Sequence, residues 1–229
     1  MFGVLINVLT VVVGALVGLL FKKGIPERVS KAAMIGLGVC TLYIGISGSL
    51  CGENVLIIIA SVVLGAICGT LLDIDGAVNR LATKVEGKFR KEGQKTSLAE
   101  GFVSSTLLFC VGSMTVTGSI QAGLTGDPSI LITKAMLDLV SAMMLASSLG
   151  AGVLLSAGSV LVIQGGLVLL AGVISPLMGP EAVSEMTCAG SLLIIMIGTN
   201  LMGITKFKVA DYLPAILFAP ILHNIVSLF

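Results

Sequence analysis

Charged residues are scarce in this sequence, since Asp, Glu, Lys and Arg together make up only 11% of its 229 residues. Soluble domains carry about 25% charged residues, and a mean hydropathy of +1.12 leaves too little polar surface for one. The composition therefore excludes a water-soluble fold. Each transmembrane helix needs about 20 apolar residues, because its backbone must satisfy its own hydrogen bonds in lipid. We expect an all-α integral membrane protein with about eight spans.

Residues that carry chemistry are also few. Histidine occurs once, at His223, and no H-E-x-x-H, G-x-S-x-G or P-loop motif is present, so we expect no enzyme. The five cysteines lack metal-ligand spacing and lie mostly in apolar runs, so we interpret them as packing residues and expect no disulfide framework, zinc or other cofactor. A net charge of +1 gives no indication of a nucleic-acid partner.

The apolar runs predict a single polytopic membrane domain over residues 1–229. The expected spans lie near residues 2–21, 33–50, 54–72, 99–119, 130–149, 153–177, 186–203 and 210–228. The first run has no basic residues before it and no A-x-A cleavage site, which favours a retained helix over a signal peptide.

The basic residues predict the orientation of these spans. If the N-terminus lies outside and successive spans cross the membrane in alternating directions, twelve of the thirteen fall in cytoplasmic loops. The thirteenth, Lys134, lies inside a span. The opposite loops then hold only the acids Glu53, Asp127, Glu181 and Glu185. This agrees with the positive-inside rule and predicts that both termini lie on the outer side of the membrane. Residues 74–95 alternate apolar and basic residues at helical spacing, which predicts an amphipathic helix on the cytoplasmic leaflet or, as the alternative, a solvated loop.

An internal repeat relates the two ends of the chain. The stretch P-E-R-V-S at residues 26–30 recurs as P-E-A-V-S at residues 180–184, and flanking glycines correspond, including Gly45 with Gly198. Repeat A would cover about residues 2–72 and repeat B about 153–228, with a central helix pair over about 99–149. In the predicted orientation the first spans of the two repeats cross the membrane in opposite directions, so the repeats are inverted, as in many secondary transporters. The alternative is chance similarity between glycine-rich helices.

The two central spans hold the most unusual residues. Hydroxyls and glycines interrupt the fourth span at Gly112, Ser113, Thr115 and Thr117, and the glycine-rich segment through residues 126–128 extends the interruption. We expect either a broken helix that offers polar groups to a ligand, or a plain glycine-rich contact and loop.

Lys134 and Asp138 lie four residues apart in the fifth span, and so share one helix face near the middle of the bilayer. Mid-membrane charge costs about 3 to over 10 kcal/mol unless it is paired or hydrated, so it indicates a function by default. We expect Asp138 to bind a proton or cation, with Lys134 neutralising it or receiving an anionic solute group. The alternatives are a structural ion pair and a Lys134 side chain that snorkels outward.

Three amides, Asn7, Gln164 and Asn200, could face the same interior, although each alone is typical of an interhelical hydrogen bond. His223 is expected at the headgroup level, near the outer end of the last span.

Several segments together resemble one family. They are residues 3–7 (G-V-L-I-N), residues 109–114 (F-C-V-G-x-M), Lys134-x-x-x-Asp138, Gln164-Gly165 and residues 213–215 (L-P-A). On these the whole chain resembles the YdfK/YqgA family of bacterial inner-membrane proteins, a domain of unknown function. The resemblance implies a multi-pass membrane protein and adds little on mechanism.

These observations favour a small secondary transporter or channel-like permease for a small polar or anionic solute, with possible coupling to an ion. The alternative is a non-transporting scaffold or sensor subunit in which the charges only specify packing. The partners we expect are the lipid bilayer and the solute. A second copy of the chain, in a homodimer, would complete the solute path that eight spans enclose poorly.

Overall fold

A computed structural model gives the fold and describes residues 1–22, 27–80, 98–110 and 113–227. These residues are helical with connecting turns, and no strand occurs among them. The helices are α1 (Phe2–Lys22), α2 (Glu27–Ser49), α3 (Val55–Leu71), α5 (Leu98–Cys110), α6 (Ser113–Leu124), α7 (Ser129–Leu149), α8 (Gly152–Leu169), α9 (Ala171–Ile174), α10 (Pro180–Leu201) and α11 (Ala215–Val226), with 3₁₀ turns η1 (Ser175–Leu177) and η2 (Val209–Tyr212). A further helical stretch covers Ile74–Arg80.

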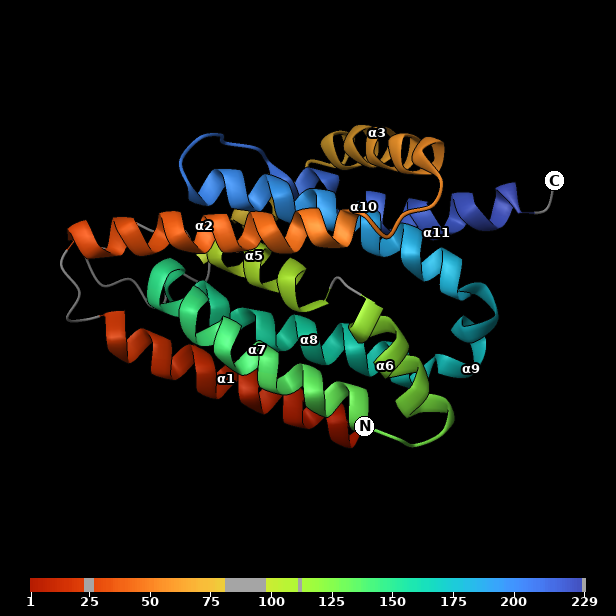
Figure 1. The fold of residues 1–229 in the computed structure, drawn as a ribbon, viewed down its shortest axis with the longest axis horizontal. Helices are drawn as coiled ribbons and strands as arrows, with labels where there is room; N and C mark the ends of the chain where they lie inside the picture. The colour runs from red at the N-terminus through yellow and green to blue at the C-terminus, as the bar shows by residue number, and fades with distance from the viewer. Residues whose placement is uncertain (23–26, 81–97, 111–112, 228–229) are drawn as a thin grey trace.

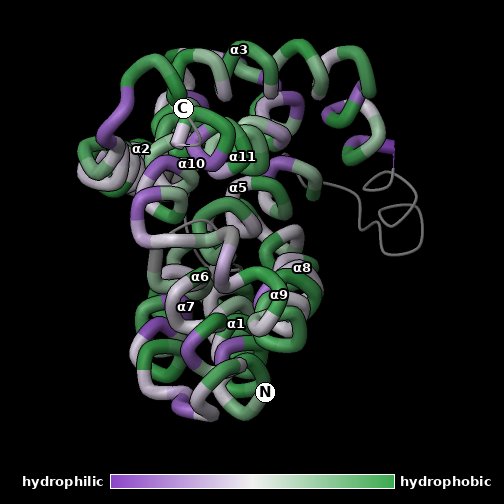
Figure 2. The backbone as a smooth tube through the Cα atoms, turned by 90° about the vertical axis from the view of Figure 1, so that its right-hand side faces the viewer, coloured by the Kyte–Doolittle hydropathy of each residue, from purple (hydrophilic) through white to green (hydrophobic). Residues whose placement is uncertain are grey.

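The helices form two groups that lie one above the other (Figures 1 and 2). The upper group consists of α2, α3, α10 and α11, in which α2 packs along α10 and α3 along α11. The lower group consists of α1, α6, α7, α8 and α9, in which α1 packs along α7 and α8. Helix α5 lies between the groups and contacts α7, α8 and α10.

Close approach of small residues holds these pairs together. Gly14 and Gly18 of α1 lie directly against backbone carbonyls of α7, so closely that a Cβ atom at either glycine would collide with them. Membrane helices use glycine in this way because contacts between backbones replace the hydrophobic effect as the source of attraction. Since Gly3 packs on Leu131 and Gly14 on Leu139, α1 and α7 run parallel.

The outer surface is apolar, as a bilayer requires. Large hydrophobic side chains are exposed along α1, α2, α3, α7 and α8, and hydrophobic residues predominate along the helices in Figure 2. The membrane character predicted from composition is therefore confirmed.

The described residues contain five segments that are long and apolar enough to cross a bilayer, or seven if each of two bent pairs counts as one span. The five are α1, α7, α8, α10 and Val209–Val226; the bent pairs are α3 with Ile74–Arg80 and α5 with α6. The remaining predicted span corresponds to α2, whose apolar part in the described residues, Gly38–Ser49, is shorter than a full span.

Two sequence predictions about this architecture differ from the structure or lie outside the residues it describes. The predicted amphipathic helix over residues 74–95 falls mostly on residues 81–97, which lie outside the described residues. Glu181 and Glu185 do not lie in a loop as predicted, because α10 begins at Pro180 and includes both. Proline is favoured at the first position of a helix, where its missing N–H has no acceptor to lose.

Candidate functional site

An ion pair lies inside the lower group of helices. Lys134 and Asp138 occupy successive turns of α7 and the Lys134 Nζ contacts the Asp138 Oδ2. Both residues are about 6% exposed. The prediction that they share one helix face is confirmed, whereas the alternative that Lys134 snorkels outward is wrong, because its ammonium group turns inward to the carboxylate.

Two amides from neighbouring helices adjoin this pair. Asn7 of α1 donates a hydrogen bond from its Nδ2 to the Oε1 of Gln164 in α8 over 3.1 Å, and both side chains are fully buried. Asn7 also lies within hydrogen-bonding reach of the Asp138 carboxylate. The structure thus brings together four of the predicted site residues, from three helices.

The hydrogen bonding of this group is incomplete. The Nε2 of Gln164 is buried without a hydrogen-bond partner. A buried donor left unpaired costs about 1 to 3 kcal/mol. The Gln164 amide therefore has donor capacity that a polar ligand or a water molecule would use.

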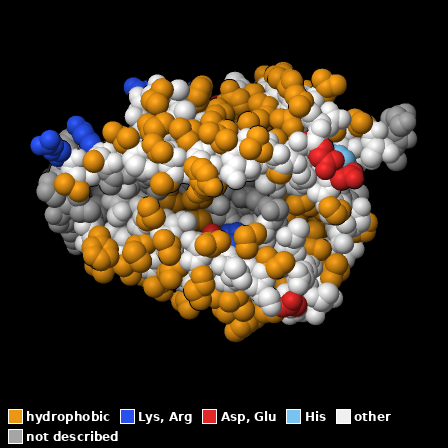
Figure 3. All heavy atoms as spheres, in the orientation of Figure 1, with side chains coloured by type: hydrophobic (Ala, Val, Ile, Leu, Met, Phe, Trp, Pro, Cys, Tyr) orange, Lys and Arg blue, Asp and Glu red, His pale blue; other side chains and the backbone are white. Residues whose placement is uncertain are grey.

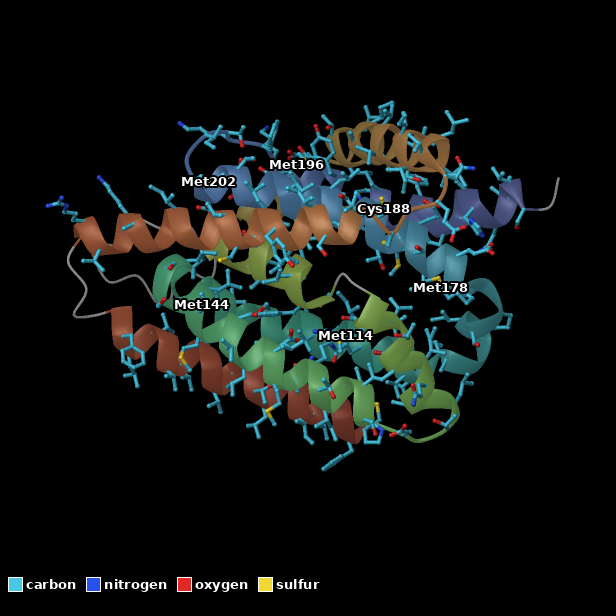
Figure 4. The ribbon with its side chains drawn as sticks, viewed as in Figure 1. Met114, Met144, Met178, Cys188, Met196 and Met202 are labelled. Atoms are coloured by element: carbon cyan, nitrogen blue, oxygen red, sulfur yellow. The ribbon has the colours of Figure 1, made fainter. Side chains whose placement is uncertain are left out.

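A break in the helix lies beside the ion pair. Helix α5 ends at Cys110 and α6 begins at Ser113, at an angle of 58° to it. Cys110 lies close enough to Lys134 and Asp138 to interact electrostatically with both. Met114, labelled in Figure 4, marks the start of α6 near the middle of the molecule. The two helix ends leave backbone carbonyls and N–H groups without intrahelical partners near the charges.

The break is shorter than the sequence predicted. Gly112 lies outside the described residues, but Ser113, Thr115 and Thr117 are already helical in α6. Thr115 is buried and its hydroxyl donates to the carbonyl of Phe109 over 3.1 Å, so it caps the end of α5. Thr117 is exposed.

Helix α6 continues as far as Leu124 despite its glycines. Gly118 lies against Ile130 of α7, and Gly123 lies against the end of α8. The predicted extended interruption of the helix is therefore absent from α6, and its glycines serve as close packing contacts instead.

Figure 3 shows a basic and an acidic side chain side by side in the central part of this face, among hydrophobic side chains. Elsewhere on this face, charged side chains lie near the rim of the molecule (Figure 3).

Two other predicted polar residues lie away from the ion pair. Asn200 is at the end of α10, where its amide donates to the Phe207 carbonyl and accepts from the Phe207 N–H, both over 2.9 Å. It fixes a loop and does not face the interior as expected. The Nε2 of His223 lies 3.3 Å from the carboxylate of Glu181, near the opposite end of α10.

The sequence analysis missed two buried carboxylates. Glu185, 1% exposed, accepts hydrogen bonds from the N–H groups of Glu53 (3.0 Å) and Asn54 (2.8 Å), before α3. Asp211, 6% exposed, accepts from the Asp75 N–H over 2.8 Å. The proline that starts α10 is the signal that would have placed Glu185 inside a helix.

Comparison with known proteins gives a consistent result. A family model described as "Protein of unknown function (DUF554)" matches residues 2–224. The chain is 30% identical over 233 residues to the "Uncharacterized membrane protein YdfK" of Bacillus subtilis (strain 168), covering 100% of this chain and 98% of the relative. It is 33% identical over 220 residues to the "Uncharacterized protein YqgA" of Escherichia coli (strain K12), covering 95% and 94%. No solved structure matches.

Proposed function

The chain belongs to the DUF554 family, whose function is unknown, and we propose that this membrane protein is a small secondary transporter or channel-like permease. Its solute is small and polar or anionic, and its movement is coupled to an ion. The observation that carries the proposal is the buried Lys134–Asp138 pair beside the break between α5 and α6. Discontinuous helices next to intramembrane charge are typical of solute sites in transporters.

Each part of this site has a role in the proposal. Lys134 receives an anionic group of the solute, while Asp138 takes up the coupling proton or cation. The free Nε2 of Gln164 supplies a further donor. The hydroxyls and glycines around the break, Ser113, Thr115, Thr117 and Gly112, were predicted as ligands; we retain the break as the solute-facing element, with Thr115 as its cap.

An inverted repeat is the second part of the proposal. The repeat matches α1 with α8, α2 with α10, and α3 with α11, and the two members of each pair contact one another. Elements related by a two-fold axis that passes between them would meet in this way.

The contacts between α2 and α10 support the repeat at the level of residues. Gly38 packs against Gly198, and Gly45 packs against Ser191. The alignment that matches Gly45 with Gly198 also matches Gly38 with Ser191, so these two contacts are images of each other. Since residue numbers rise along α2 as they fall along α10, the helices are antiparallel, as inversion requires.

Eight spans with both termini outside the inner membrane complete the proposal. Counting α2 as a span adds one to the seven segments that meet the length and apolarity criteria. The parallel packing of α1 and α7 agrees with the predicted orientation, in which the first and fifth spans cross in the same direction. Alternating access then consists of rocking one repeat against the other, in a protein that forms a homodimer.

The alternative function is that of a membrane scaffold or sensor subunit. One observation favours it: Lys134 and Asp138 neutralise each other directly, so neither charge needs a solute as its counter-ion. In that case the interior stays closed to water.

Thiol labelling separates the two functions. Asp138→Cys in a cysteine-free background is treated with a membrane-impermeant maleimide from each side of sealed vesicles. A transporter gives labelling that a solute or ion changes, whereas a scaffold gives none from either side. Leu145→Cys, at a position on α7 that is also buried, is the matched control and should stay unlabelled in both cases.

A thermal-shift screen then identifies the solute class. The purified protein is compared with Asp138→Asn and Lys134→Met against amino acids, organic acids, nucleobases and ions. A ligand of the folded state raises its apparent stability by mass action. A solute that stabilises the wild type but neither variant would support the site; no shift, with both variants less stable, would favour the scaffold.

A further inference from the structure

A second polar site lies at the opposite end of α5 from the helix break. A pocket of about 440 Å³ is formed by the helical stretch Ile74–Arg80, the first turns of α5, the end of α10 and the loop after it. Met202, labelled in Figure 4, follows the last residue of α10 and so marks this end of the helix. The volume falls within the range of small-molecule sites.

The pocket is separate from the ion pair in α7. Glu100 lines it and lies ten residues before Cys110 on α5, which corresponds to about 15 Å along the helix. Leu107, Leu149 and Val153, each at most 1% exposed, belong to the apolar core between the two sites. A ligand in the pocket would therefore not touch Lys134 or Asp138.

The pocket carries charges of both signs. Asp75 and Glu100 contribute carboxylates and Lys206 contributes an ammonium group. In the described part of the chain, neither Glu100 nor Lys206 has a hydrogen bond or an ion pair. Two opposite charges that line one cavity without neutralising each other are available to a ligand that carries both.

Hydrogen bonds that involve neither Glu100 nor Lys206 fix the walls of the pocket. Asn200 holds Phe207 of the loop by two hydrogen bonds of 2.9 Å. The Asp211 carboxylate accepts a hydrogen bond from the Asp75 N–H, and Asn79 donates one to the Asp75 Oδ2 over 2.9 Å. These bonds anchor the start of this helical stretch. Such a preformed site saves ordering cost when a ligand binds.

We propose that this pocket binds a small zwitterionic amine, with its ammonium group between Asp75 and Glu100 and its anionic group at Lys206. The site stands independently of the proposed transport function. Two sources provide this chemistry: a free amino-acid-like solute, and the phosphoethanolamine headgroup of a lipid. With Lys206 and Arg80 among the residues that the positive-inside rule assigns to the cytoplasm, the pocket faces the inner side of the membrane.

The absence of tryptophan from the sequence permits a direct binding assay. Phe207 lines the pocket and is 46% exposed, so Phe207→Trp places the sole indole of the protein at the site. The indole fluorescence is titrated with glycine and with glycerophosphoethanolamine in nanodiscs of phosphatidylglycerol, and is compared with nanodiscs that contain phosphatidylethanolamine. Ethanolamine, which carries only the positive charge, is the control ligand.

We expect a saturable change with glycine if the source is a free solute. If the source is lipid, the change appears with glycerophosphoethanolamine and is already complete in phosphatidylethanolamine nanodiscs. Glu100→Gln and Lys206→Gln should each weaken binding at least ten-fold, which corresponds to about 1.4 kcal/mol. Lys31→Gln, at an exposed lysine of α2 that does not line the pocket, should leave it unchanged.

Three results would overturn the proposal: no saturable change with any probe in either lipid, ethanolamine binding as tightly as the zwitterions, or binding that Glu100→Gln and Lys206→Gln leave unaltered. Because Lys206 is exposed, its substitution removes no buried contact, so loss of binding in that variant reports the site and not unfolding.

Discussion

The side-chain amide of Asn7 in α1 donates a hydrogen bond to that of Gln164 in α8, over 3.1 Å and out of reach of solvent. This bond links two helices that the proposed repeat would relate. It also fixes the direction of the Gln164 amide, whose Nε2 then has no partner of its own. The Asn7–Gln164 bond therefore both joins α1 to α8 and orients a polar group in the interior of the lower group of helices.

A double-mutant cycle measures this link. We expect Asn7→Leu and Gln164→Leu to destabilise the fold non-additively, with a coupling of about 0.6 to 1.7 kcal/mol, the range of interhelical hydrogen bonds in membranes. The free energy of unfolding in mixed micelles of denaturing and mild detergent provides the measurement. Additive effects would contradict a direct bond.

We expect substitutions in the Lys134–Asp138 ion pair to destabilise the protein more strongly. Lys134→Met or Asp138→Leu alone leaves an uncompensated buried charge, and we expect a loss of about 3 to 5 kcal/mol for either. The double variant removes both charges and should recover much of this loss. Arg80→Met, which breaks the exposed pair with Asp73, is the control and should cost less than about 1 kcal/mol. A double variant as unstable as the worse single variant would show that the charges have other partners.

Glycine substitutions test the close approach of α1 and α7. We expect Gly14→Leu and Gly18→Leu to destabilise the protein by about 1 to 3 kcal/mol or more, because each side chain would overlap the α7 backbone. Gly158→Leu is the matched control, since no atom lies within 4 Å of a Cβ built there. Melting temperatures in detergent provide the comparison, and equal effects at the three positions would refute the contact.

The carboxylate of Glu185 tests the link between α10 and α3. Its Oε1 accepts two backbone N–H groups, an arrangement that glutamine reproduces and alanine does not. We expect Glu185→Ala to lower the unfolding free energy by about 1 to 3 kcal/mol, and Glu185→Gln to lower it much less. Thermal unfolding of both variants decides this, and identical losses would exclude the N–H contacts as the cause.

Acid sensitivity is expected at the turn before α7. Hydrogen bonds from the Ser129 hydroxyl and N–H, together with one from Gln121, hold the pKa of Asp127 below its ordinary value of 3.8. A lowered pKa in the folded state contributes stability that is fully present above the ordinary value and is lost as pH falls through the lowered one. The difference in melting temperature between wild type and Asp127→Ala should therefore be constant near neutral pH and shrink below about pH 4. A difference that grows in acid would reverse the assigned sign.

The local sequence pattern was sufficient to predict the apolar helices and the Lys134–Asp138 ion pair. Long apolar runs define spans because lipid forbids any other backbone arrangement, and four-residue spacing places Lys134 and Asp138 together whatever surrounds them.

Partners from distant helices could not be predicted in this way. The roles of Asn200 and Asp211 depend on a loop and on a second helix end, and helical periodicity carries no information about either. The length of the break after Cys110 was overestimated because glycines that seemed to interrupt a helix serve instead as its contacts.

The pairing of α1 with α7 has a consequence for how the protein is made. The ribosome completes α1 about 100 residues before it reaches α7, an interval of roughly 5 to 20 s at ordinary rates of synthesis. Throughout that time the glycines of α1 face lipid or whatever insertion machinery is near, with their eventual partner not yet translated. Assembly of the lower group is thus a post-insertion event, and a nascent chain that stalls before α7 leaves α1 without its parallel neighbour.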